Sequence, residues 1–135
     1  MHSVVISGTG LCQPPHTITN AELVESFNRY VDRENTRHAA EIAAGTRPAL
    51  QYSSVEFIEK ASGIQQRYVF DKSGILDPAR MYPHYAERAD SELSMMAEIA
   101  VAAAQQALAQ AGRSGADVDA VLCAASNMQR AYPAM

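Results

Sequence analysis

The sequence predicts an α/β fold that combines a mostly parallel or mixed sheet with one buried, alanine-rich central helix. Three segments support this prediction: a β-branched run at 3–7, a helical pattern of small residues at 91–111, and a continuous apolar run at 120–126. A strand, a crossover helix and a second strand form a right-handed βαβ unit. The unbroken apolar run is typical of a strand that is covered on both faces.

The first predicted strand leads into an irregular loop and then into a helix. The loop 8–15 is not expected to be regular, because its paired glycines and adjacent prolines both interrupt backbone ladders. Thr19 and Glu22 then have the spacing of a capping box, in which the hydroxyl reaches the third helical amide and the carboxylate reaches back. One face of this helix is apolar, made of Leu23, Val24, Phe27 and Val31.

The middle of the chain is patterned more weakly. Helix formers persist over 32–52, and Gly45 predicts a helix end there. Ser53 and Glu56 have the spacing of a second capping box, which opens a short helix that Gly63 closes.

The clearest element is the long helix that follows a strand at 64–70 and a loop at 71–89. Asp90 or Ser91 is expected to cap this helix, and Gly112 to end it. Because its stripe of apolar residues is mostly alanine, a neighbouring backbone can approach it closely, and we expect the helix to be central and well buried. The stripe consists of Leu93, Met96, Ala97, Ala100, Ala103, Ala104, Ala107 and Ala111.

Composition excludes several classes of function. With 47% hydrophobic residues and a net charge of −4, the chain is globular and lacks the basic surface that general binding to nucleic acid or anionic membranes needs. Its apolar runs are too short to span a bilayer, and its start lacks the features of a signal peptide. Four scattered histidines have no metal-ligand spacing. We expect a cytoplasmic protein without a metal or a cofactor.

Two motifs that suggest chemistry have simpler interpretations. Gly8 and Gly10 follow a strand, but Gln13 stands where a dinucleotide fingerprint needs its third glycine, and the next two residues are prolines. These glycines are better explained by a sharp turn beside a packed helix. Cys123 is predicted to lie inside an apolar strand, and Cys12 lies in a loop without a charged neighbour. Neither setting activates a thiol. We therefore expect Cys123 to be a core residue and Cys12 to be an unreactive free thiol.

Several segments together, in order and spacing, resemble one family. Each motif alone is weak, but the ordered set covers most of the chain. It resembles the β-ketoacyl-acyl-carrier-protein synthase III enzymes, which are condensing enzymes of the thiolase superfamily. The matching segments are Ile6–Gly10 with Pro14, Thr19–Leu23, Glu56–Ile64 with Arg67, Met95–Gly112, and Asp117–Ser126 leading to Ala131–Pro133.

The resemblance implies a decarboxylative Claisen condensation in fatty-acid biosynthesis. An acyl group passes from acyl-CoA, or from an acyl carrier protein thioester, to a cysteine at a helix N-terminus, and malonyl-acyl carrier protein then attacks it. The expected partners are acyl-CoA, acyl carrier protein and a second copy in a homodimer. The resemblance places the catalytic cysteine, histidine and asparagine beyond Met135, so we expect this chain alone to be inactive.

The resemblance also assigns binding residues. Ser53 and Phe57 match a polar contact and an aromatic that stacks on the adenine at the CoA end of the donor. The family's neighbouring arginine is replaced by Ala61, and Lys60 or Arg67 is expected to substitute for it. Phe57 is equally well explained as an ordinary helix-face anchor. The residues Ser126, Asn127 and Tyr132 match the segment that forms the acyl pocket and dimer interface.

We therefore expect residues 1–135 to form the N-terminal part of a thiolase-like domain, with insertions at about 32–52 and 71–89 relative to the family. Three alternatives stay open. The first is a related acyl-CoA Claisen or acyl-transfer enzyme. The second is a non-catalytic thiolase-like partner subunit, and the third is a free-standing nucleotide-binding domain.

Overall fold

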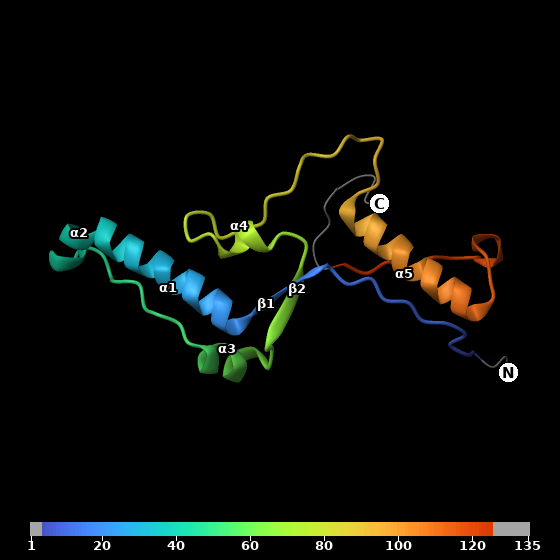
Figure 1. Cartoon of the computed structure of the whole chain (residues 1–135), viewed down its shortest axis with the longest axis horizontal. Coiled ribbons are helices and arrows are strands. Elements are labelled where there is room, and N and C mark those ends of the chain that lie inside the picture. The colour runs from blue at the N-terminus through green and yellow to red at the C-terminus, as the bar shows by residue number, and fades with distance from the viewer. Residues whose placement is uncertain (1–3, 126–135) are drawn as a thin grey trace. The chain divides into compact units, whose positions relative to one another are not determined.

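The computed structural model describes residues 4–125 of the 135-residue chain. The described part is α/β, with helices and a small antiparallel sheet (Figure 1). It divides into two compact units. The middle unit comprises residues 14–86, and the end unit comprises the described residues of 1–13 and 87–135. Each unit is described by itself.

The sheet of the middle unit consists of β1 (His16–Thr19) and β2 (Gln66–Val69). The two strands are antiparallel, with His16 opposite Val69. Ile18 of β1 is 1% exposed and forms part of the small core. The strand predicted over 64–70 is confirmed at its centre. Its partner β1 was missed, because it carries a single buried apolar residue and no alternating pattern.

Helix α1 (Asn20–Arg37) begins at the predicted capping box, which is confirmed. The Glu22 N–H donates to Thr19 Oγ1 at 3.3 Å, and the Thr19 N–H donates to Glu22 Oε2 at 2.9 Å. The helix continues well into the weakly patterned stretch. After a break at His38, a short second helix, α2 (Ala39–Ala43), follows.

The chain then turns at Gly45, where φ is +71°, and returns along α1 as an extended segment (Figure 1). Two asparagine side chains hold it there. Asn35 accepts from the Leu50 N–H at 2.9 Å and donates to the Leu50 carbonyl at 3.0 Å. Asn28 does the same for Ser53, at 2.9 and 3.1 Å. The seven residues from Asn28 to Asn35 rise about 10.5 Å along the helix, and the three residues from Leu50 to Ser53 span about 10 Å of extended chain. Both asparagines can therefore bind the return segment at the same time, and we call these two pairs of hydrogen bonds the asparagine clamps.

Helix α3 (Val55–Ser62) follows, and Gly63 ends it in the left-handed conformation at φ +68°, as predicted. The predicted N-cap is displaced by one residue. Ser54 caps the helix and accepts from the Phe57 N–H at 3.1 Å. Ser53 is not the cap, because the Asn28 clamp holds its backbone in the extended return segment.

The prediction that 71–89 is entirely loop is wrong at its start, where α4 (Lys72–Leu76) forms. Asp71 caps this helix, accepting from the Gly74 N–H at 3.2 Å, and its second oxygen accepts from the His84 N–H at 2.5 Å. These amides, with the Ser73 hydroxyl, lower the pKa of Asp71 to about 2. One carboxylate therefore fixes both the helix start and the loop that follows it.

The end unit is built on α5 (Met95–Ala111). Its predicted end at Gly112 is confirmed, with φ +64°. The predicted start is four residues early: the cap is Ser94, which is 2% exposed and accepts from the Ala97 N–H at 3.1 Å. Ser91 has the right residue type for a cap, but Ser94 lies directly before the first apolar turn.

The alanine stripe of α5 receives the backbone of the N-terminal segment, as its small residues predicted. A Cβ atom on Gly8 would lie 2.1 Å from the carbonyl oxygen of Ala107, and one on Gly10 would lie 1.9 Å from that of Ala103. Real Cβ contacts are essentially never below 3.0 Å. Only glycine fits at these two positions, so the predicted packing against a helix is confirmed. The sharp turn predicted there is not found, because no turn is assigned to residues 8–10.

Two glutamines of α5 hold the same segment. The Thr9 N–H donates to Gln110 Oε1 at 2.6 Å, and the Leu11 N–H donates to Gln106 Oε1 at 3.1 Å. Four helical residues rise about 6 Å, close to the span of two extended residues, about 6.7 Å. The end unit therefore uses the same principle as the asparagine clamps of the middle unit.

The parallel sheet predicted from these segments is not found in the described residues. The stretches 4–7 and 120–125 contain no assigned strand, and the sheet that does form is a two-stranded antiparallel one in the middle unit. A strand needs a neighbour to complete its hydrogen bonds, and here the N-terminal segment meets α5 instead. The predicted burial of α5 is also wrong, because Ala97 is the one fully buried residue along it.

Candidate functional site

The exposed face of α3 carries the first two candidate binding groups. Phe57, in the first turn, is 67% exposed, and Lys60 follows three residues later and is also exposed. Residues three apart lie on the same helix face, so an aromatic ring and a cation are presented together. Among the described residues Lys60 has no ion pair shorter than 4.0 Å, which leaves its ammonium group accessible.

Acidic side chains flank this face. Glu56 contacts the Ser54 hydroxyl, and its pKa is lowered mainly by its own backbone N–H and then by that hydroxyl. It is therefore a carboxylate at neutral pH and lies near the positive N-terminal end of the helix. The face therefore presents an aromatic ring and a cation beside a carboxylate of the first helical turn.

Ser53 lies beside α3 and lines a groove between that helix and α1. The groove has a volume of about 270 Å³ and is almost entirely apolar. Because the Asn28 side chain binds the Ser53 N–H and carbonyl, the Ser53 backbone is held at the groove wall. The residues that line the groove are Leu23, Val24, Phe27, Ser53, Ile58 and Met81.

Arg67 is positioned differently from the other candidates. It lies on β2, and its guanidinium donates to Asn20 Oδ1 at 2.8 Å. Asn20 is 2% exposed. Its side-chain amide donates to the Ile64 carbonyl at 2.7 Å, and its backbone N–H donates to the Gln65 carbonyl at 3.2 Å. Arg67 therefore links β2 to the first residue of α1, whereas Lys60 has no such structural contact.

The remaining predicted site residues, Ser126, Asn127 and Tyr132, lie outside the described residues. Of the two cysteines, Cys12 is half-buried and Cys123 is exposed. The prediction that Cys123 is a core residue is therefore wrong. Within residues 4–125 no strand pairs with the segment around Cys123, and its residues 120–125 are exposed. Within residues 4–125, no group of three or more histidine, cysteine, aspartate or glutamate residues is arranged to hold a metal ion.

Sequence reasoning missed the asparagines that fix this site. Asn20, Asn28 and Asn35 all use their amides to hold the backbone of other segments. The one available signal is the seven-residue spacing of Asn28 and Asn35, which places both on one side of α1. None of the helices in the described part is long and apolar enough to cross a membrane.

Comparison with known proteins agrees with the motifs. No family model matches the chain. It is 56% identical over 112 residues, or 83% of its length, to the β-ketodecanoyl-[acyl-carrier-protein] synthase of Pseudomonas aeruginosa. The match spans 32% of that relative, so the chain corresponds to about a third of the curated protein. Over these 112 residues the chain is therefore similar to a β-ketoacyl-acyl-carrier-protein synthase III-like condensing enzyme, and the resemblance that its ordered motifs predicted is confirmed.

Proposed function

We propose that the protein containing this chain is a fatty-acid condensing enzyme that joins an acyl thioester to malonyl-acyl carrier protein. The main support for this proposal is the 56% sequence identity over 112 residues to a β-ketodecanoyl-acyl-carrier-protein synthase. The acyl group moves from CoA to an enzyme cysteine and releases CoA thiol. Malonyl-carrier protein then loses carbon dioxide, and its carbanion attacks the acyl-enzyme carbonyl. The products are a 3-oxoacyl-carrier protein and the free thiolate.

Neither cysteine of this chain is proposed as the nucleophile. Such a cysteine is activated at a helix N-terminus or by a histidine partner. Cys12 precedes the prolines of an irregular loop, and Cys123 lies in an exposed segment without regular structure. The role proposed for this chain is therefore to bind the donor. The homodimer, the cytoplasmic location and the pocket role of Ser126, Asn127 and Tyr132 stay predictions.

At the donor site, Phe57 is proposed to stack on the adenine and Lys60 to contact the phosphates of CoA. The exposure of both side chains on one face of α3 supports this assignment. Arg67 is a weaker candidate for the phosphates, because its guanidinium already binds Asn20. Ser53, fixed by its backbone clamp, is proposed to contact the donor where it enters the groove.

The test uses the full-length protein that contains this chain, assayed for condensation of acyl-CoA with malonyl-acyl carrier protein. Base stacking on an aromatic contributes about 1–3 kcal/mol, so Phe57→Ala should raise the KM for acyl-CoA by about 5- to 150-fold. Because the adenine is bound equally in the ground and transition states, kcat should stay the same. Lys60→Gln should also raise this KM.

Two controls make the result specific. Tyr85→Ala removes an exposed aromatic away from α3 and should leave the KM for acyl-CoA unchanged. An acyl-pantetheine donor, which lacks the adenine and its phosphates, should be insensitive to both α3 variants. Absence of any condensation would refute the function. Normal condensation with an unchanged KM in Phe57→Ala and Lys60→Gln would refute only the donor site.

A further inference from the structure

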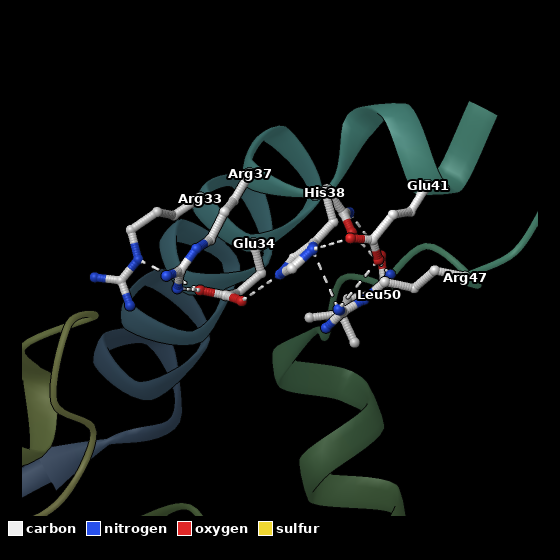
Figure 2. Close-up of polar contacts among 8 residues, drawn as sticks. Arg33, Glu34, Arg37, His38, Glu41, Arg47 and Leu50 are labelled. Atoms are coloured by element: carbon white, nitrogen blue, oxygen red, sulfur yellow. Dashed lines mark hydrogen bonds and ion pairs between the residues drawn. The ribbon is translucent and has the colours of Figure 1, made fainter. Parts of the chain in front are cut away.

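The corner between α1 and α2 contains a histidine with two competing partners. His38 separates the helices, with φ −108° and ψ 21°, and its side chain makes no capping bond to the backbone. Its Nδ1 lies 3.2 Å from Glu41 Oε1 of α2 and also 3.2 Å from Arg47 Nη1 of the following turn. Its Nε2 lies 3.7 Å from Glu34 Oε2 of α1 (Figure 2).

These two contacts at Nδ1 exclude one another. A guanidinium has only N–H donors, and a carboxylate has only acceptors. The single Nδ1 atom either accepts from Arg47 through its lone pair or, when it carries a proton, donates to Glu41. The neutral ring that satisfies most partners has its proton on Nε2, facing Glu34, and its Nδ1 lone pair toward Arg47.

We propose that protonation of His38 is a switch that transfers its Nδ1 from Arg47 to Glu41 and leaves the Arg47 guanidinium with only its longer contact to Glu41. Histidine is the side chain that ordinarily changes charge between pH 5 and 8. In the protonated state, His38 donates to Glu34 and Glu41, and its charge repels Arg47.

The surrounding charges support this exchange. Hydrogen bonding to His38 is the main reason that the pKa of Glu41 is lowered, so Glu41 is a carboxylate at neutral pH. Arg47 keeps a longer ion pair to Glu41 Oε2, at 3.6 Å. The other charged neighbours are Arg33 and Arg37, each 3.8 Å from Glu34 Oε1.

The moving part is small, because its two ends are fixed. The Thr46 N–H and hydroxyl both bind the Glu41 carbonyl at 3.0 Å, and Leu50 is clamped by Asn35. Only the short stretch around Arg47 lies free between these points. The switch therefore changes which surface presents a guanidinium and leaves the helices in place.

The test is nuclear magnetic resonance of the unmodified chain with ¹⁵N-labelled histidine and arginine. At high pH, the His38 ring should carry its proton on Nε2. Because guanidinium exchange is base-catalysed and slows by itself as pH falls, the Arg47 rate is compared with that of free arginine at each pH. The protection of Arg47 calculated in this way should fall several-fold as His38 becomes protonated, with the same midpoint. A proton on Nδ1 at high pH, or Arg47 exchange that does not follow the His38 midpoint, would overturn the proposal.

Variants give an independent readout. His38→Gln should abolish the histidine-linked step in Arg47 exchange. Arg37→Gln removes an arginine that contacts only Glu34 in this cluster, and the step should persist. A step at Arg47 that survives in His38→Gln would show that another group controls it.

Discussion

Replacing Gly10 by alanine should loosen the end unit by an amount that the geometry of α5 sets. The new Cβ would lie 1.9 Å from the Ala103 carbonyl oxygen, so the segment must move away by about 1.5 Å to reach an ordinary contact of 3.4 Å. The hydrogen bonds of Thr9 and Leu11 to the two glutamines, now 2.6 and 3.1 Å, would then exceed 3.5 Å. At about 1 kcal/mol each, their loss costs about 2 kcal/mol.

The assay is hydrogen exchange of the α5 amides, which reports the opening of this unit alone. Since 1.4 kcal/mol corresponds to a tenfold change, a loss of about 2 kcal/mol lowers protection about thirtyfold. Gly115→Ala is the matched control in the same unit, because its Cβ would meet nothing within 4 Å. It also removes the flexibility of a glycine from the unfolded chain, so the comparison cancels that effect. Equal protection in the two variants would refute the role of close packing.

Two further predictions concern the middle unit. Asn28→Ala should lower its stability by about 1–2 kcal/mol through loss of both bonds to Ser53. The isosteric Asn28→Asp should also lower it, because a carboxylate oxygen would replace the donor and face the Ser53 carbonyl; an Asn28→Asp variant as stable as the parent in a urea titration would contradict the two-bond clamp. Backbone amides lower the pKa of the Asp71 carboxyl from 3.8 to about 2 in the folded chain. As pH falls, the carboxyl is therefore protonated in the unfolded chain before it is protonated in the folded chain. The stability that Asp71 contributes is present above about pH 4 and is lost as pH falls toward 2. Asp71→Asn should flatten this acid dependence and free the loop 80–84, whereas Asp90→Asn, at an exposed residue, should preserve it; an unchanged acid profile in Asp71→Asn would show that the carboxylate is not responsible.

Local chemistry predicted the helix ends well. The capping box at Thr19 and the left-handed glycines Gly63 and Gly112 follow from rules that involve only neighbouring residues. The close approach of Gly8 to α5 was predictable for the same kind of reason, because a stripe of alanines leaves room for a backbone and for little else. The family was predictable because its short motifs keep their order.

Features that depend on distant partners were not predictable. Whether the apolar run at 120–125 forms a strand depends on a neighbouring strand, and within the described residues it has none. Ser53 was assigned as a cap because nothing local shows that Asn28, 25 residues earlier, holds its backbone. At the candidate site, the residue types indicated Lys60 and Arg67 equally. Only the contact of Arg67 with Asn20 separates them.

The match between helix and extended chain restricts how the length of this protein can vary during evolution. Deleting one residue between Leu50 and Ser53 would shorten the return segment by about 3.3 Å, so one asparagine would lose its partner. Deleting two helical residues between the asparagines would restore the length, but it would turn one amide by about 200° to the far side of α1. No small compensation exists, so between Asn28 and Ser53 the insertions and deletions among homologues should be confined to the connection at 38–49, outside both clamps.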